Sequence, residues 1–261
     1  SVSAAETTPP PSNTSTGAIQ WHDPEFERLI RMALDKTEGP VSQAELDGIT
    51  QLIIYGEFCF LDWSFNGMDV RYGEDAYYVN NIEYKRSSLS DISDITHLRN
   101  LEELEIHFTS VEDISFIVER RNLHFADLGD NKLVDITPLT DLTNIEVLGL
   151  QNNLISDITP LFNMENLSYL NLSSNNISDI RALGNLKHLG SLDLSDNNIS
   201  KINVLSGLKS LKLLYLWGND IKNIDSLAEL DQLEYLEISE NGNIDPEKLK
   251  DLLPNTTIHL S

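Results

Sequence analysis

A pattern of apolar residues that recurs every 22 residues constrains the fold of this chain more than any other feature of its sequence. The repeated unit can be written LxxLxLxxNxIxDIxxLxxLxx. A constant period between about 20 and 50 residues is typical of solenoid proteins, in which each unit packs only against its neighbours. Eight units follow one another without a change of register, beginning at Val79, Leu101, Leu123, Ile145, Leu167, Leu189, Leu211 and Leu233.

Each unit predicts one short β-strand. Its fourth and sixth positions are apolar and the fifth is mostly polar, and this period of two sends the apolar side chains inward. A strand at Ile49, Leu52 and Ile54 and another at Ile258 and Leu260 bring the expected number of parallel strands to ten. The DIxPLxxL segment is too short for a full α-helix and predicts a 3-10 or extended return. We therefore expect a right-handed, curved α/β solenoid with its parallel sheet on the concave face and the wider returns on the convex face.

Two stretches show the unit most clearly, NLSYLNLSSNNISDIRALGNLKH and GSLDLSDNNISKINVLSGLKS. They resemble the 22-residue bacterial class of leucine-rich repeats that is typified by the internalins. The resemblance extends from about residue 24 to the C-terminus. It implies a helical N-terminal cap and a protein ligand such as a host receptor, although some surface repeat proteins serve in cell-wall organisation instead.

Local signals divide the chain into segments. Asp23 before Pro24 is typical of a helix start, and Ser42 with Glu45 forms a capping box. We expect a disordered Ser/Thr/Pro tether at 1–20, a helical N-terminal cap at 21–48, a first strand with an aromatic hairpin insert at 49–78, the repeats at 79–244, and a C-terminal capping helix and strand at 245–261.

The insert breaks the regular spacing. Ile49 lies 30 residues before Val79, eight more than one repeat, and the insert FCFLDWSFNGMDVRYGEDAYY at 58–78 holds seven of the 19 aromatic residues. Asn66-Gly67 between alternating apolar runs is typical of a β-hairpin. The aromatic rings are expected either to pack on the cap or to form a protruding recognition ribbon.

Asparagine occupies the ninth position of most units. We interpret this row as a buried amide ladder that satisfies backbone groups in the turns, because an amide both donates and accepts hydrogen bonds. The Asp residues of the Asp-Ile pairs are expected to accept from their own backbone two residues on. The amide row comprises Asn131, Asn153, Asn175, Asn197, Asn219 and Asn241, and the acidic row comprises Asp91, Asp113, Asp135, Asp157 and Asp179.

The best candidate for a binding site is a group of large side chains at outward positions of the predicted sheet. Rings at these positions have no core to enter, and exposed apolar groups often mark interaction sites. The alternative is that they are incidental surface aromatics. The candidate residues are Tyr169, Leu213, Tyr215, Trp217 and Tyr235.

A second group of candidates lies toward the N-terminus. Glu83, Glu105 and Asp127 share the fifth position of successive units and predict a carboxylate ladder, with Glu103 beside it and His107 nearby. Like charges on neighbouring strands repel one another, so a cationic partner or water must offset them. We include Glu103, Glu105, Asp127 and Phe125 among the candidate ligand-binding residues. A metal site is the alternative, but no ligand-spacing motif supports it, and a solvated acidic face is the default.

Composition narrows the possible functions. The 42 Asp and Glu against 18 Lys and Arg give a net charge of −24, which argues against a nucleic-acid ligand. No apolar run is long enough to predict a membrane-spanning helix. The single cysteine, Cys59, has no evident basic partner, and the six His residues fit no catalytic motif. We therefore expect neither an enzyme nor a bound cofactor or metal.

The resulting hypothesis is a non-enzymatic recognition module. It is expected to be a monomer, secreted or displayed on the surface of a Gram-positive-type bacterium, and to bind a protein ligand, such as a host surface protein, across its concave face. Two alternatives stay open: a surface protein that binds carbohydrate or cell wall through the same aromatic side chains, and an intracellular scaffold for protein interactions.

Overall fold

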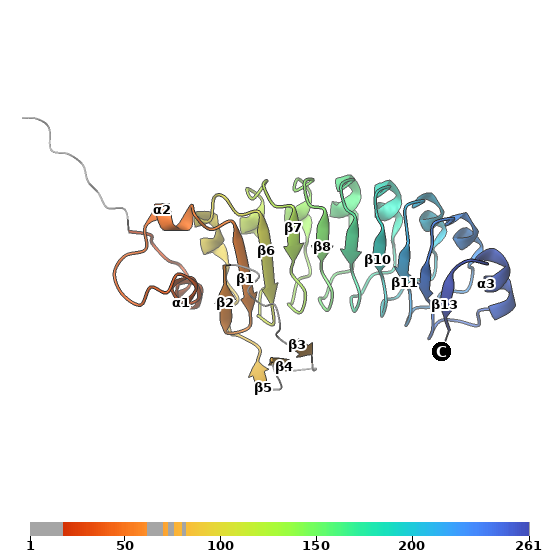
Figure 1. Ribbon diagram of the computed structural model, residues 1–261, viewed down its shortest axis with the longest axis horizontal. Coiled ribbons are helices and arrows are strands. Elements are labelled where there is room, and N and C mark those ends of the chain that lie inside the picture. Colours follow the sequence, from red (N-terminus) through yellow and green to blue (C-terminus); the bar gives the residue numbers. More distant parts are fainter. Residues whose placement is uncertain (1–17, 62–69, 73–75, 80–81, 261) are drawn as a thin grey trace, which may run out of the picture.

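The computed structural model describes residues 18–61, 70–72, 76–79 and 82–260. They form a leucine-rich repeat solenoid (Figure 1) in which one ten-stranded sheet runs along the molecule in the order β13-β12-β11-β10-β9-β8-β7-β6-β1-β2. The strands are β1 (Gln51–Tyr55), β2 (Phe58–Phe60), β6 (Glu103–His107), β7 (Phe125–Asp127), β8 (Val147–Gly149), β9 (Tyr169–Asn171), β10 (Ser191–Asp193), β11 (Leu213–Tyr215), β12 (Tyr235–Glu237) and β13 (Thr257–His259). Strand β2 is antiparallel to β1, and the other neighbouring pairs are parallel.

The returns are short 3-10 helices, as the DIxPLxxL segments predict. They are η1 (Ser93–His97), η2 (Ser115–Ile117), η3 (Thr137–Leu139), η4 (Thr159–Asn163), η5 (Arg181–Asn185), η6 (Asn203–Gly207) and η7 (Asp225–Glu229). The core between sheet and returns consists of the Leu and Ile residues of the repeat, nearly all fully buried. No unit could bury these side chains alone, so the stability of each depends on its neighbours.

The asparagine row is a buried amide ladder, which confirms the structural interpretation. The Nδ2 of Asn175 donates to the carbonyl oxygens of Leu150, Leu172 and Ser173 at 2.9 to 3.1 Å. Its Oδ1 accepts from the backbone N–H of Ile155 in the preceding repeat at 3.0 Å. The same pattern recurs at Asn153, Asn197, Asn219 and Asn241. Each amide therefore joins two repeats.

The acidic row is structural as well. Oδ1 of each Asp accepts from the backbone N–H two residues on, at 2.7 to 3.0 Å, just before a 3-10 return begins. Part of the net negative charge thus arises from the turns of the repeat.

A backbone feature that the sequence analysis does not predict occurs at the eighth position of each unit. This residue has a positive φ between 52° and 66° in seven successive units, although only one of the seven is glycine. The conformation lets its N–H reach the next repeat, as where Asn152 donates to the carbonyl oxygen of Ser173 at 2.9 Å. The residues are Phe108, Asp130, Asn152, Ser174, Asp196, Gly218 and Glu240.

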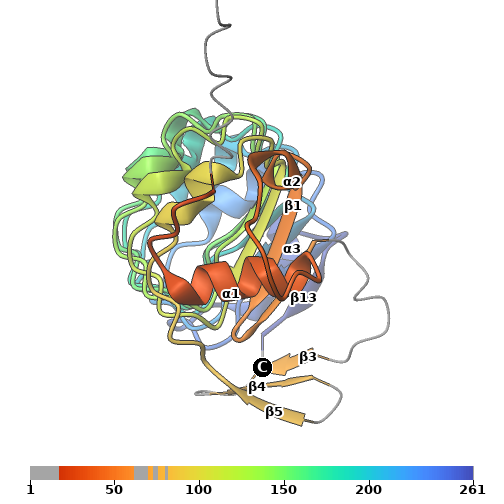
Figure 2. The same ribbon diagram turned by 90° about the vertical axis from the view of Figure 1, so that its left-hand side faces the viewer.

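Helices close both ends of the solenoid. Helix α1 (Pro24–Ala33) is capped by Asp23, and α2 (Gln43–Leu46) has the predicted capping box of Ser42 and Glu45. Figure 2 shows both helices at the N-terminal end of the sheet. At the other end, Asp245 caps α3 (Pro246–Leu252), as expected. The described helices are too short and too polar to cross a lipid bilayer.

The segment between β2 and β6 corrects the predicted set of strands. The sequence assigns a unit beginning at Val79, with its strand at Ile82 and Tyr84, to the solenoid. Strand β5 (Ile82–Lys85) instead pairs with β4 (Ala76–Val79), which pairs with β3 (Val70–Tyr72), in a separate antiparallel sheet. This sheet lies outside the solenoid in Figures 1 and 2. The ten strands of the main sheet are completed by β2 in place of β5.

The segment that begins at Val79 matches the 22-residue period by coincidence and is not a unit of the solenoid. Strand β1 pairs directly with β6, Ile53 beside Glu105, so the chain leaves the solenoid after β2 and re-enters it near Ser87. Two backbone bonds to the end of β6 fix these points: Gly56 N–H donates to the His107 oxygen and Ser87 N–H to the Phe108 oxygen, both at 2.8 Å.

The structure describes the strands on either side of Asn66-Gly67, where the sequence predicts a hairpin. Strands β2 and β3, which flank this dipeptide, do not pair with each other, because β2 pairs with β1 and β3 with β4. The Asn66-Gly67 turn itself lies outside the described residues, as does most of the tether predicted at 1–20, and both stay predictions.

Candidate functional site

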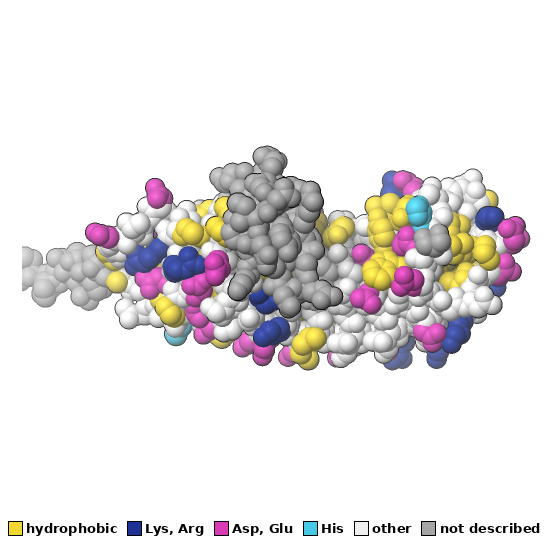
Figure 3. Space-filling model, turned by 90° about the horizontal axis from the view of Figure 1, so that it is seen from below, with side chains coloured by type: hydrophobic (Ala, Val, Ile, Leu, Met, Phe, Trp, Pro, Cys, Tyr) yellow, Lys and Arg dark blue, Asp and Glu magenta, His cyan; other side chains and the backbone are white. Residues whose placement is uncertain are grey.

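The strand register places the aromatic candidates on one surface, which we call the aromatic patch. Tyr169, Leu213 and Tyr235 share the third position of their repeats, because each strand pairs with the next at this position. Tyr215 occupies the fifth position of its repeat, at the end of β11, and Trp217 follows it two residues on. Tyr169, Leu213 and Trp217 expose 39%, 36% and 38% of their surface, and the other two side chains are half-buried. Figure 3 shows hydrophobic side chains gathered toward the C-terminal end of the solenoid, with acidic side chains among them.

Within the patch, the ring of Tyr215 contacts that of Tyr235, which in turn contacts the ring of His259. The centroids of Tyr215 and Tyr235 lie 5.3 Å apart, and those of Tyr235 and His259 are also 5.3 Å apart. The sequence analysis did not include His259 in the site. His259 occupies the fifth position of the last repeat unit, in register with Glu237, and this position could have identified it. The contacts hold these rings in place before any ligand arrives, which lowers the entropic cost of binding.

Two carboxylates border the patch on either side of Tyr215. Asp193 and Glu237 share the fifth position with it, on the neighbouring strands β10 and β12. Asp193 Oδ1 accepts from the N–H of Ser195 at 2.9 Å, and Glu237 Oε1 accepts from the N–H of Ser239 at 3.1 Å. Desolvation raises the pKa of the Asp193 carboxyl, although its hydrogen bonds to Ser195 act in the opposite direction.

The accessible outward positions of the sheet carry one sign of charge, because His107, the one basic group among them, is buried. The third, fifth and seventh positions of the repeats that contain β6 to β12 hold five carboxylates and neither Lys nor Arg. These acidic residues are Glu103, Glu105, Asp127, Asp193 and Glu237. The basic side chains of these repeats therefore lie elsewhere, and any ligand on this face meets a negative potential.

The N-terminal candidates form a different, largely buried arrangement. Glu105 and His107 are only 4% and 2% exposed. The His107 ring stacks on Tyr55, with 4.7 Å between centroids, and the Tyr55 hydroxyl lies 3.1 Å from Glu105 Oε2. His107 Nε2 lies 3.4 Å from Asp127 Oδ1, and Nδ1 lies 3.7 Å from Asp130 Oδ2.

Burial and neighbouring charges together shift the pKa values of Glu105 and His107. Desolvation raises the pKa of Glu105 to about 7. Desolvation also lowers the pKa of His107, but Asp127 and Asp130 outweigh it and raise that pKa to about 9. The cluster therefore balances its charges internally, and its inaccessible groups fit a structural role better than ligand contact.

The remaining N-terminal candidates are half-buried and already hold protein partners. Glu103 Oε2 accepts from Gln51 Nε2 at 2.5 Å, and Asp127 Oδ1 accepts from Gln151 Nε2 at 3.1 Å. Phe125 pairs with Glu103 in the register and lies on the same strand as Asp127. The predicted carboxylate ladder is wrong in one member: Glu83 belongs to β5, and Ile53 occupies the place beside Glu105.

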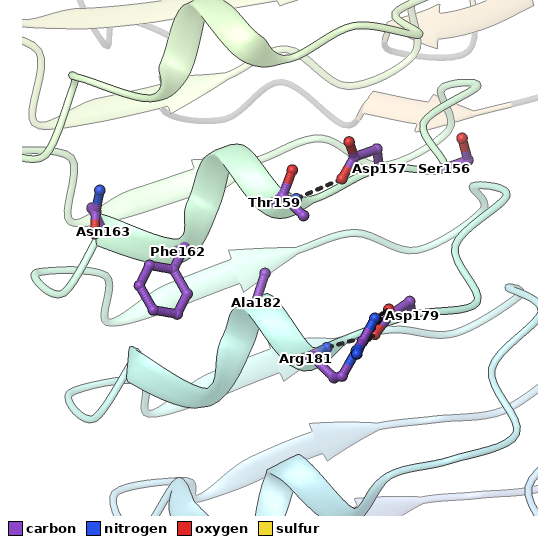
Figure 4. Close-up of a pocket in the computed structure, with 8 residues that line it drawn as sticks. All are labelled: Ser156, Asp157, Thr159, Phe162, Asn163, Asp179, Arg181 and Ala182. Atoms are coloured by element: carbon purple, nitrogen blue, oxygen red, sulfur yellow. Dashed lines mark hydrogen bonds and ion pairs between the residues drawn. The ribbon is translucent and has the colours of Figure 1, made fainter.

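The convex side carries a separate groove. It has a volume of about 660 Å³ and is formed by the neighbouring returns η4 and η5. In Figure 4, Phe162 stands at one end, and Arg181 pairs with Asp179 at the other. Its lining is mainly short polar side chains, and Phe162 is its one aromatic residue.

The described residues contain no group of three or more His, Cys, Asp or Glu side chains arranged to hold a metal ion. Cys59 is buried, and desolvation raises the pKa of its thiol to about 12, which makes a nucleophilic thiolate unfavourable.

Comparisons with known proteins agree with this geometry. A model of leucine-rich repeats in two copies matches residues 121–163 and 165–207. An internalin of Listeria monocytogenes, InlF, is 29% identical over 92% of this chain and 69% of its own, with a TM-score of 0.71. This chain carries leucine-rich repeats and is similar in fold to the internalins.

Two further solved structures share the fold. Internalin C2 of Listeria monocytogenes is 24% identical, with a TM-score of 0.74 over 92% of this chain and 93% of its own. A leucine-rich repeat protein of Leptospira interrogans is 23% identical, with a TM-score of 0.59 over 67% of this chain and 53% of its own. No curated protein sequence matches. A curved solenoid of this kind presents an extended concave surface, which repeat proteins use for binding.

Proposed function

We propose that this internalin-like protein is a non-enzymatic recognition module that binds a protein ligand through the aromatic patch. The observation that carries the proposal is the exposure of Tyr169, Leu213 and Trp217 on one ordered sheet surface. Trp and Tyr supply most of the binding energy at many protein interfaces, and they lose little conformational freedom on binding. The ligand, such as a host surface protein, would lie across the C-terminal half of the concave face.

The domain assignment, the location and the oligomeric state belong to the same proposal. The helical N-terminal cap, the repeats and the C-terminal cap act as one interaction unit, secreted or displayed on the surface of a Gram-positive-type bacterium. The module works as a monomer, which light scattering coupled to size-exclusion chromatography tests directly. Residues encoded upstream of Ser1 test export, since a signal peptide there supports it and an ordinary cytosolic start supports an intracellular scaffold.

Site-directed photo-cross-linking tests the binding surface. A benzophenone amino acid replaces Leu213 in the patch or, as a matched control, Phe162 in the convex groove. Each protein is incubated with host-cell extract and irradiated. The proposal expects a cross-linked protein from position 213 alone, and competition by unlabelled wild-type chain but not by Trp217→Ala. Equal cross-linking from both positions contradicts it.

A carbohydrate ligand is the second candidate, because the exposed Tyr and Trp rings could also stack on sugars. A glycan array distinguishes the two. Signal on defined glycans that disappears in Trp217→Ala favours carbohydrate, whereas a silent array with a protein cross-link at position 213 favours the first proposal.

A further inference from the structure

The side chains around Tyr215 indicate which chemical groups the proposed ligand should carry. Strand β11 presents Leu213 and Tyr215 outward, and Trp217 follows, so three large side chains form a ridge. The strands on either side present carboxylates in register with Tyr215, Asp193 on β10 and Glu237 on β12. Adjacent strands are about 4.8 Å apart, so the backbone positions of Asp193 and Glu237 lie at about that distance on either side of Tyr215.

Each carboxylate accepts from a backbone N–H two residues on, and that of Glu237 also interacts with the side chain of Tyr235. Asp193 uses Oδ1 for the Ser195 N–H, and Glu237 uses Oε1 for the N–H and hydroxyl of Ser239. The nearest basic group to either is His259, whose Nδ1 lies 3.9 Å from Glu237 Oε2, at the limit of an ion pair. Among the described residues, no Lys, Arg or His lies within ion-pair distance of Asp193. A half-buried carboxylate without a cation is unfavourable, and a cationic ligand would remove that cost.

The geometry points to a protein ligand that places a basic side chain, arginine in preference to lysine, over Tyr215 between Asp193 and Glu237, with apolar neighbours on Leu213 and Trp217. Charge complementarity supports the basic group, since the outward positions around the ridge carry carboxylates and no Lys or Arg. The preference for arginine follows from its planar guanidinium, which stacks on an aromatic ring and donates to carboxylates on both sides. This inference rests on the proposed function, because it describes the part of the ligand that meets the aromatic patch.

The test uses the full chain and peptides from a random twelve-residue phage library. Peptides are selected on the wild-type protein and counter-selected on Trp217→Ala, so that only patch-dependent binders remain. The inference expects arginine beside an apolar residue to be enriched. Each selected peptide is then synthesised with arginine, lysine or citrulline, which has the shape of arginine without its charge.

Affinities for the three peptides are measured by fluorescence polarisation on three proteins. Replacing arginine with citrulline should weaken binding to the wild type by about tenfold or more. In the double variant Asp193→Asn with Glu237→Gln, the same replacement should change the affinity little, because both carboxylates are absent. These substitutions keep the oxygens that accept from Ser195 and Ser239, so folding is preserved. Asp157→Asn is the matched control, since Asp157 Oδ1 accepts from the Thr159 N–H at 2.8 Å in the same way on a return.

The outcomes separate the two proposals. Loss of the arginine advantage in Asp193→Asn with Glu237→Gln, but not in Asp157→Asn, supports the inference. Binders that depend on Trp217 but tolerate citrulline overturn the inference and leave protein recognition by the patch intact. If no selected peptide depends on Trp217, both proposals fail.

Discussion

The ring of His107 stacks on Tyr55 with centroids 4.7 Å apart, and it thereby joins β6 to β1 although 52 positions separate the two residues. Both side chains lie at the base of the segment that leaves the solenoid. Arg86, at the end of that segment, donates to the carbonyl oxygen of Thr109 at 2.9 Å and lies 5.8 Å from the Phe108 ring centroid. The buried cluster around His107 therefore supports the points where the chain leaves and re-enters the repeats.

This cluster makes stability depend on pH. The folded protein raises the pKa of Glu105 from 4.5 to about 7, so the fold disfavours the ionised form. The stability gained from the protonated carboxyl is complete below pH 4.5 and is lost as the pH rises through 7. Glu105→Gln cannot ionise, so we expect it to gain about 2 kcal/mol relative to wild type between pH 4.5 and 8. Urea unfolding at several pH values measures this difference, and a constant difference across the range would contradict it.

His107 is a base and not an acid, but its pKa also rises on folding, so stability again falls as the pH rises. Its pKa rises from 6.5 to about 9 in the folded protein, because Asp127 and Asp130 outweigh burial. The corresponding stability is complete below pH 6.5 and is lost as the pH rises through 9. The advantage of wild type over His107→Gln should therefore shrink between pH 6.5 and 9.5, as measured by urea unfolding. His188→Gln, which removes an exposed histidine in the turn after η5, is the control for the loss of a histidine side chain.

Removing one amide of the ladder should strongly destabilise the solenoid. In Asn175→Ala, the buried N–H of Ile155 loses its acceptor. The carbonyl oxygens of Leu150 and Leu172 each lose one of two donors, because Asn153 and Asn197 also donate to them. We expect the free energy of unfolding to fall by about 2–4 kcal/mol. Thermal and urea denaturation followed by circular dichroism measure the loss. Asn176→Ala is the control, since Asn176 is exposed, and a loss of the same size there would argue against the ladder.

Glycine should be favoured at the eighth position of a repeat. Glu240 is exposed and has a φ of 52°, a conformation that side chains with a Cβ rarely adopt. Glu240→Gly should raise the free energy of unfolding by about 0.5–1 kcal/mol, whereas Glu240→Ala should not. Gly218→Ala should destabilise, because its φ is 66° and a Cβ there would lie 3.3 Å from Asp196 Cα. Denaturation of the three variants tests the ranking, which a stabilised Gly218→Ala would overturn.

Truncation in the aromatic patch should separate binding from stability. Trp217→Ala or Tyr215→Ala should weaken ligand binding by about 2 kcal/mol or more and leave the melting temperature nearly unchanged. Calorimetric titration with the cross-linked ligand and thermal denaturation give the two quantities. Phe162→Ala removes an exposed ring from the convex groove and should change neither. A fall of many degrees in Trp217→Ala would show that the ring is structural.

The repeat pattern alone was sufficient to predict most of the fold. The period of 22 residues fixes which side chains face inward, so the strands from β6 onward, the 3-10 returns and the asparagine ladder follow from the sequence. The helix caps at Asp23, Ser42 and Asp245 were also predictable, because a capping signal is local in sequence. The outward columns, and with them the aromatic patch, follow from the same register.

The tertiary structure decided what depends on contacts between distant segments. A unit beginning at Val79 fits the period, yet β5 pairs with β4, because strand pairing is decided by neighbours in space. The contact between Tyr55 and His107 and the burial of Glu105 arise only once β1 lies beside β6. The sequence thus determined which residues face the concave surface. Only packing decided which of them are buried and paired, as at Glu105, and which stay exposed, as at Trp217.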